Sequence, residues 1–172
     1  DSYGARYYIA EKYFLLGDHK KSLRYRPWFY KHFPDDFGNP ELHLFWLIAG
    51  FLDGKMKIGV HHLIDLEELN LYVVPLILGK EVDSLDSRHM MNLSTLEYAL
   101  SVNAQWRKKI PEEAIALLHE KTNHPIYLQN KEEMIAGKLA LSKEYDTEKR
   151  GLILERREEL IEHWKLACEK LF

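Results

Sequence analysis

The stretch that decides the fold runs from Asn39 to Gly54 and reads NPELHLFWLIAGFLDG. Asn39 is a favoured N-cap residue, and Pro40 suits the first position of a helix. Leu42 to Leu52 is strongly apolar, which indicates a helix that is buried on most of its surface. Gly54 follows that run, and a glycine in this place is a common signal for the end of a helix.

Helical patterns continue on both sides of this stretch and add up to about eight helices. Ser94, with Glu97 three residues later, forms a capping box that predicts a helix start. Val73 to Leu78 has the composition of a short strand, but Pro75 in its centre favours an apolar connector packed on the helices. We therefore predict an all-α protein in which residues 1–172 form one domain, with a connector at 71–90 and a helical C-terminal part at 91–172.

Composition and charge fit a soluble protein and exclude little else. Hydrophobic residues make up 46% of the chain, charged residues 30%, and the net charge is -3. This charge gives no general reason to expect nucleic acid or an anionic membrane as a partner. Cys168 is the single cysteine, so no internal disulfide can form, and its apolar neighbours predict burial. No stretch is long enough to span a membrane and no signal peptide is visible, so we expect a cytoplasmic protein. Since the sequence starts without Met, it can be a fragment whose leader is missing.

Two glycine turns recur in the first half of the chain, Leu15-Leu16-Gly17-Asp18 and Phe51-Leu52-Asp53-Gly54. Gly17 and Gly54 are 37 positions apart (54 minus 17), close to the period of roughly 34 residues in tetratricopeptide (TPR) repeats. A helix, a turn and an antiparallel helix cannot bury their own apolar face, so such hairpins stack. The spacing predicts two hairpins within residues 1–70.

Residues 5–36 resemble a TPR unit. With Gly17-Asp18 on the turn, Tyr13 falls on the aromatic position of the motif, Ser22 on the small residue of the second helix, and Pro34 on the closing proline. Residues 41–70 resemble the motif less closely, with Gly59 at the small-residue position and no closing proline.

The first unit also departs from the motif. Arg26 stands where the family has an aromatic residue, and Phe29 where it has alanine. Pro27 lies inside the second helix, where it removes a backbone hydrogen bond at a cost of roughly 3 kcal/mol. We therefore expect that helix to be kinked, or split at Arg26.

The resemblance implies a peptide-binding groove lined by the first helix of each hairpin. Tyr7 and Glu11 stand where carboxylate-clamping TPR domains carry Lys and Asn, so the implied groove is apolar and aromatic and suits a helix or hydrophobic strip. Its implied lining is Tyr7, Glu11, Phe14, Leu44, Ile48 and Phe51. The alternative is that these side chains are core, or are covered by the C-terminal helix.

One helix face carries a set of possible metal ligands. His61, Asp65 and Glu68 lie at helical steps of four and three, with His62 adjacent. Imidazole and carboxylate groups on one face can bind a divalent metal, but a complete site needs ligands from another helix. The sequence does not place such ligands, and surface polar residues explain the pattern as well. We therefore predict no metal and no cofactor.

Two arginine–histidine pairs raise the possibility of a helical ribonuclease. Arg156 and Arg157 precede His163, and Arg26 precedes His32, by five to seven positions, a spacing that resembles the HEPN family of ribonucleases. That resemblance implies a histidine for proton transfer and an arginine for the phosphate charge. With nine histidines in the chain, pairs of this kind also arise by chance, and Glu158 follows the arginine where the family has another polar residue.

A basic and aromatic cluster lies in residues 20–31 and offers a second alternative. Phosphate contacts and base stacking by such residues suit RNA or single-stranded DNA, although a solvated outer helix face explains the pattern too. The candidate residues are Lys20, Lys21, Arg24, Trp28 and Lys31.

No Gly-rich phosphate loop, paired-cysteine motif or nucleophile elbow is present. The sequence thus favours a protein-binding scaffold over an enzyme and over a nucleic-acid adaptor.

Overall fold

The computed structural model of the chain describes residues 4–85 and 91–169, and within them every regular element is a helix. The prediction of an all-α protein is confirmed for these residues. The α-helices are α1 Ala5–Leu15, α2 His19–His32, α3 Pro40–Leu52, α4 Met56–Leu69, α5 Val73–Ile77, α6 Leu96–Trp106, α7 Glu112–Thr122, α8 Pro125–Lys143 and α9 Thr147–Glu169. Two short 3-10 helices, η1 Asn92–Ser94 and η2 Arg107–Lys109, flank α6.

The turns predicted around α1 and α3 are present. Asn39 caps α3, because its side chain accepts a hydrogen bond from the backbone N–H of Leu42 at 2.9 Å. Gly17 and Gly54 both have positive φ, +65° and +69°, the conformation that ends a helix at low cost only for glycine. These residues therefore fix two helical hairpins, α1–α2 and α3–α4.

Three predicted details need correction. Helix α2 was expected to be kinked or split at Arg26, and the split is wrong, because the helix continues through Pro27. The N-cap of α6 is Thr95 rather than Ser94, since the Thr95 hydroxyl accepts from the backbone N–H of Tyr98 at 3.3 Å. The predicted connector contains a short helix, α5, which tolerates Pro75 in its first turn. Residues 86–90 of that connector lie outside the described part of the chain.

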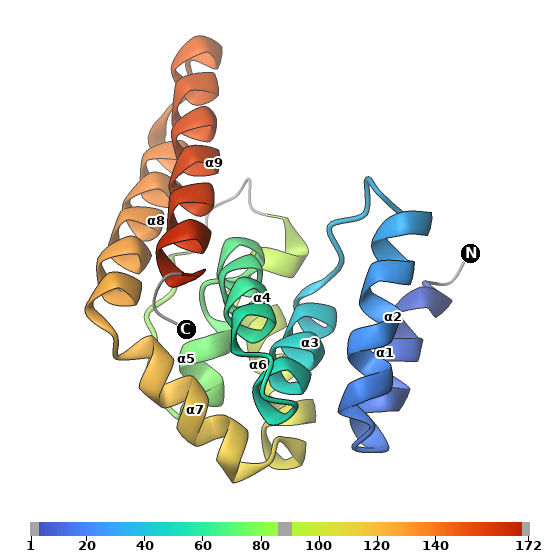
Figure 1. Cartoon of the computed structure of the whole chain (residues 1–172). Coiled ribbons are helices and arrows are strands. Elements are labelled where there is room, and N and C mark those ends of the chain that lie inside the picture. The colour runs from blue at the N-terminus through green and yellow to red at the C-terminus, as the bar shows by residue number, and fades with distance from the viewer. Residues whose placement is uncertain (1–3, 86–90, 170–172) are drawn as a thin grey trace.

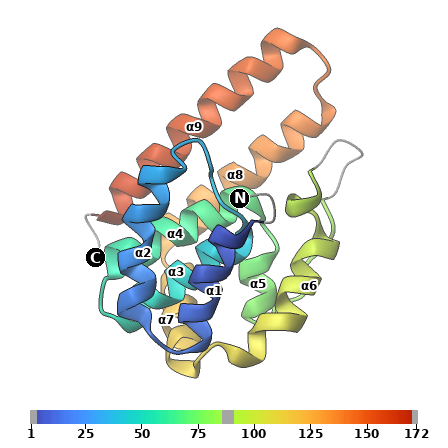
Figure 2. The same ribbon diagram turned by 90° about the vertical axis from the view of Figure 1, so that its right-hand side faces the viewer.

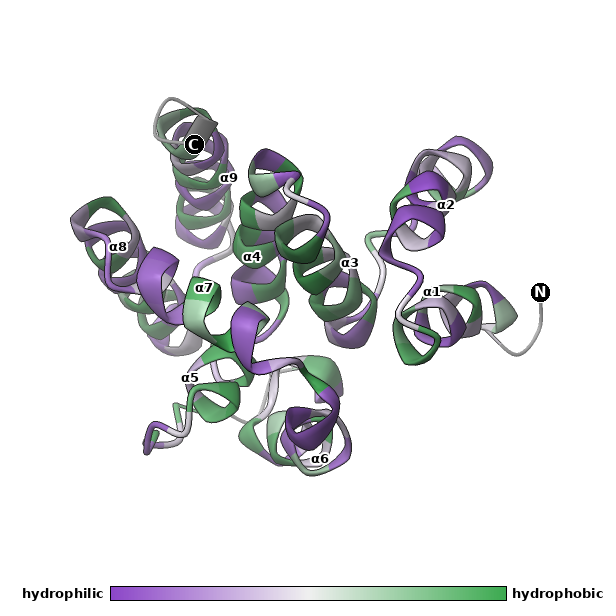
Figure 3. Ribbon diagram, turned by 60° about the horizontal axis from the view of Figure 1, so that its bottom comes forward, coloured by the Kyte–Doolittle hydropathy of each residue, from purple (hydrophilic) through white to green (hydrophobic). Residues whose placement is uncertain are grey.

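Helix α3 forms the centre of the core. All its residues from Pro40 to Phe51 except Glu41 are buried, and the helix packs against α1, α2, α4 and α7. Figure 3 shows the same helix coloured as hydrophobic over most of its length, whereas the outer helices alternate between polar and apolar faces. The apolar run between Asn39 and Gly54 therefore becomes the element around which the others pack.

Helices α3 and α4 cross at unusually close range. A Cβ atom added to Gly50 would lie 2.6 Å from the backbone nitrogen of Gly59, closer than Cβ atoms approach in proteins. Two glycines at the crossing thus let the backbones touch. This contact sets the separation between side chains that face each other across the two helices.

The C-terminal hairpin returns the end of the chain to α4. Helices α8 and α9 pack along each other and extend beyond the rest of the molecule, as Figures 1 and 2 show from two sides. The C-terminal half of α9 packs against α4. The arrangement brings side chains from α2, α3, α4 and α9 to one place.

Candidate metal centre

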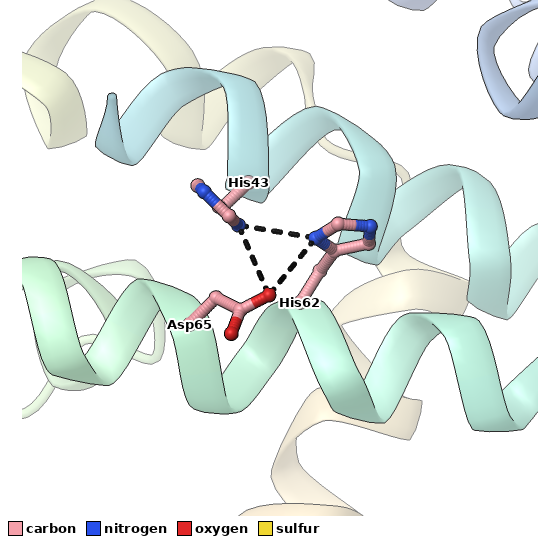
Figure 4. Close-up of side chains that lie close together, drawn as sticks. All are labelled: His43, His62 and Asp65. Carbon is pink, nitrogen blue, oxygen red and sulfur yellow. Dashed lines mark hydrogen bonds and ion pairs between the residues drawn. The ribbon is translucent and has the colours of Figure 1, made fainter. Parts of the chain in front are cut away.

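Two histidines and one aspartate meet across the interface of α3 and α4 (Figure 4). His43 comes from α3, and His62 and Asp65 come from α4, where a spacing of three residues puts them on one face. The two Nδ1 atoms are 3.0 Å apart, and Asp65 Oδ2 lies 3.6 Å from that of His43 and 3.5 Å from that of His62. Both imidazoles are buried, while the Asp65 side chain is partly exposed.

A chain of hydrogen bonds fixes the proton positions on both imidazoles. Arg26 Nε donates to His62 Nε2 at 2.6 Å, so this nitrogen carries no proton. His43 Nε2 lies 2.6 Å from the carbonyl oxygen of Phe37, so this nitrogen donates. A neutral His62 then bears its proton on Nδ1 and donates it to the unprotonated Nδ1 of His43. Every polar atom of the two rings is satisfied in this arrangement.

Burial holds both imidazoles in the neutral form. It lowers the pKa of His43 below its usual value and lowers the pKa of His62 well below it. For His62, the neighbouring His43 and the cationic Arg26 lower the pKa further. At neutral pH both rings therefore keep a lone pair that can accept a proton or bind a metal.

The carboxylate of Asp65 links the pair to the C-terminal helix and to a cavity. Its Oδ1 atom forms an ion pair with Lys165 Nζ of α9, which leaves Oδ2 directed toward the histidines. His43 and Asp65 line a cavity of about 1100 Å³, together with residues of α2, α9 and the loop that precedes α3. A group bound at the histidine–aspartate cluster can therefore be reached by a small molecule that enters the cavity.

The sequence identified part of this cluster and missed the rest. Asp65 belongs to the predicted face, and His62 was noted only as a neighbour of His61. In the structure His62 takes the place predicted for His61, and the residue that joins the cluster from another helix is His43. His61 and Glu68 line the adjacent cavity instead. His43 lies within the apolar run of α3, and this polar residue in a buried helix was the one available signal.

The residues predicted to line a peptide groove lie mostly in the core. Phe14 is 7% exposed, and Leu44, Ile48 and Phe51 are at most 3% exposed. These four side chains pack among the helices, as the alternative interpretation of the sequence expected, and offer no surface to a peptide. Tyr7 and Glu11 are partly exposed, and the Tyr7 hydroxyl donates to Asp36. Binding of a peptide by this chain remains a prediction.

Neither arginine–histidine pair is brought together. Six residues on a helix rotate the chain by 600°, so Arg157 and His163 point about 120° apart on α9. His163 is exposed, whereas Arg157 lines cavities beside α8. Arg26 binds His62 rather than His32. The structure thus supplies no arginine–histidine site of the predicted kind within the described chain.

The predicted nucleic-acid-binding cluster is accessible. Its five side chains lie on α2 and are exposed: Lys20, Lys21, Arg24, Trp28 and Lys31. The ring of Trp28 stacks against His32 at 4.3 Å between centroids, and Lys21 pairs with Asp18. This exposure is equally typical of a solvated helix face, so nucleic-acid binding stays a prediction.

Comparison of the chain with protein-family models, with curated proteins and with solved structures finds no match. Among the described residues, no helix combines the length and the apolar composition needed to cross a membrane. Function is therefore inferred from the geometry of the site.

Proposed function

We propose that this protein binds one divalent transition-metal ion, of the Zn²⁺ type, through His43, His62 and Asp65. The observation that carries the proposal is the spacing of the three donor atoms. Three atoms separated by 3.0, 3.5 and 3.6 Å lie on a circle with a radius of about 2.0 Å. An ion placed near the centre of that circle has all three atoms within the bond lengths that zinc makes to nitrogen and oxygen, about 2.0–2.2 Å.

The separations favour tetrahedral over octahedral coordination. Bonds of about 2.0–2.1 Å place neighbouring ligand atoms of a tetrahedron about 3.3–3.4 Å apart. In an octahedron the corresponding distance is about 3.0 Å. The observed distances of 3.0, 3.5 and 3.6 Å bracket the tetrahedral value, and two of the three exceed the octahedral one. Zn²⁺ is the metal for which a tetrahedral site with imidazole and carboxylate ligands is usual.

The surroundings of two ligands are those of a metal-binding site. Metal-bound histidines usually donate their second ring N–H to a carbonyl or carboxylate, as His43 does to Phe37. Lys165 holds the second oxygen of Asp65, which orients the carboxylate. These contacts fix the ligand atoms before an ion arrives.

His62 has a different neighbour, and this neighbour makes metal binding conditional. A metal on Nδ1 requires the proton of His62 to move to Nε2, the atom that now accepts from Arg26. Two N–H groups would then face each other, so the guanidinium must turn away toward the cavity that it lines. In this proposal Arg26 competes with the metal and stabilises the metal-free state.

His43, His62 and Asp65 would hold the ion with three protein ligands, which would leave a further position open to water or to a molecule from the adjoining cavity. Sites of this form bind catalytic zinc, whereas structural zinc usually has four protein ligands. A water molecule on such an ion has a pKa near 7 and can act as a nucleophile. The class of chemistry that the geometry supports is therefore metal-assisted hydrolysis of a molecule that enters the cavity.

The test is a titration of chelator-treated protein with Zn²⁺ by calorimetry, followed by visible spectroscopy with Co²⁺ in place of zinc. We expect one ion per chain and the strong absorption of tetrahedral Co²⁺. Asp65→Asn and His43→Gln should each weaken binding by about a hundredfold or more, since each removes one of three ligands.

The matched controls are exposed residues of the same types on α9, Glu162→Gln and His163→Gln, and circular dichroism verifies that each variant is folded. Equal affinities of wild-type protein and both ligand variants would refute the proposal, as would a wild-type chain that binds no Zn²⁺.

A further inference from the structure

A second cavity, of about 300 Å³, lies between the C-terminal hairpin and the region of α4 and α5. Its walls include Lys138 and Ser142 from α8, Arg150 and Arg157 from α9, and Glu68 from α4. Apolar side chains fill much of the remaining lining, among them Leu69, Leu71, Tyr72, Leu139 and Leu141. A cavity of this size is at the lower end of the range that binds small organic molecules.

Two cationic side chains in this cavity each have a buried nitrogen without a hydrogen-bond partner among the described residues. The Nζ atom of Lys138 and the Nε atom of Arg157 have almost no exposed surface, and neither makes a hydrogen bond within residues 4–85 and 91–169. Buried charges in proteins are normally paired, because an unpaired one costs several kcal/mol of desolvation. An anion bound in the cavity would supply the partner that these two nitrogens lack.

The backbone of α8 is adapted to bring these cations together. A Cβ atom on Gly137 would lie 3.1 Å from Cγ of Arg157, so the absence of a side chain lets the arginine stem lie against α8 next to Lys138. Burial, and then the charge of Arg157, lower the pKa of Lys138 to about 8. The two groups repel each other, and an anion between them would relieve that repulsion.

The other charged groups around the cavity leave this positive potential in place. Arg150 adds a third cation, whose Nη1 donates to the carbonyl oxygens of Leu141 and Glu144. Glu68 is the one acid among the described lining residues. Burial and the nearby Asp65 raise its pKa, whereas Arg157, Lys165 and Lys138 lower it, so one acid faces three cations in this cavity. Glu67, which lies behind the wall, is already bound to Tyr127 and Lys131.

We propose that this cavity binds a small organic anion with a carboxylate head and an apolar body, the carboxylate lying between Lys138 and Arg157. The guanidinium and ammonium groups supply charge-assisted hydrogen bonds to the head. The leucine side chains and Tyr72 cover the body. This site is separate from the His43–His62–Asp65 cluster and does not depend on a metal.

The experiment uses octanoate as the probe, with octanol as the uncharged analogue, on the full chain in the presence of a chelator. We expect saturable binding of octanoate by calorimetry, together with a higher midpoint of thermal unfolding, and at least a tenfold weaker effect of octanol. Lys138→Met and Arg157→Met should each weaken octanoate binding at least tenfold. Each variant removes a buried nitrogen that has no hydrogen-bond partner among the described residues, so we expect both to fold.

Exposed neighbours on the same helices, Lys143→Met and Arg156→Met, are the matched controls and should bind octanoate as the wild type does. Equal binding of octanoate and octanol would overturn the proposal, and so would octanoate binding that survives both Lys138→Met and Arg157→Met. The variant Asp86→Asn is included because Asp86 lies outside the described residues and could itself supply a carboxylate to the cavity. Octanoate binding seen only in this variant would also overturn the proposal, since a carboxylate of the chain itself would then be the anion.

Discussion

Replacing Arg26 by methionine should tighten the binding of Zn²⁺. In the metal-free protein the guanidinium donates to His62 Nε2 at 2.6 Å, and metal binding at Nδ1 must break this contact. A hydrogen bond to a charged group contributes about 1.5–3 kcal/mol. Because Met cannot form it, that energy no longer opposes the metal, and the dissociation constant should fall by about tenfold to a hundredfold.

The measurement is a competition titration against a chromophoric zinc chelator at constant pH. Arg24→Met is the matched control, because Arg24 lies two residues earlier on α2 and is exposed. Its affinity for Zn²⁺ should equal that of the wild type. An unchanged or weaker affinity in Arg26→Met would show that Arg26 does not compete with the metal, and the proton assignment on His62 would have to be abandoned.

Three further predictions concern the stability of the fold. Gly50→Ala should lower the free energy of unfolding by about 1–3 kcal/mol, because its Cβ atom would push α3 away from α4. The control is Gly151→Ala, whose Cβ atom would meet no atom within 4 Å and which should raise the free energy of unfolding by about 0.5–1 kcal/mol. Chemical denaturation measures both, and equal effects would refute the close crossing of α3 and α4. Glu67→Gln should lower the free energy of unfolding by about 3–5 kcal/mol, because it leaves Lys131 without its buried partner. The double variant Glu67→Leu, Lys131→Met should recover most of this loss, and no recovery would show that the two groups are not a buried ion pair. Between pH 7 and 9 the wild type should gain about 1 kcal/mol of stability relative to Lys138→Met. The pKa of Lys138 in the folded chain, about 8, lies below its pKa in the unfolded chain, so the unfolded state binds more protons and stability rises with pH. Parallel pH profiles of the two proteins would contradict the burial of this amine.

Local signals in the sequence were sufficient for the helices and their ends. Asn39 with Pro40, and the turns at Gly17 and Gly54, were predicted correctly because each depends on the backbone within one turn of itself. The prediction that Cys168 is buried is confirmed as well. The predicted cap of α6 was wrong by one residue, because the neighbouring Thr95, which can also cap a helix, takes that position instead of Ser94.

The site depends on contacts that no local pattern encodes. His43 and His62 are 19 residues apart, and their meeting depends on the crossing point of α3 and α4 at Gly50 and Gly59. A one-residue difference in helix rotation also decides between His61 and His62, and periodicity alone does not fix that rotation. Arg26 stood out in the sequence only as a departure from a repeat motif. Its contact with His62, at the centre of the candidate site, also depends on how the helices pack and is not encoded in a local pattern.

The ion pair between Asp65 and Lys165 also has a consequence for the order of assembly. It joins residues about 100 positions apart, so its formation closes a long loop and carries a correspondingly large entropic cost. His43 and His62, like Arg26 and Asp65, lie in the first half of the chain, so the ribosome releases them before Lys165. They can come together through contacts of short range in the sequence. On this order of events, the emerging chain holds both histidines and the aspartate while that carboxylate still lacks its lysine. Under the proposed function, the nascent chain therefore has its three metal ligands in place before α9 has been synthesised.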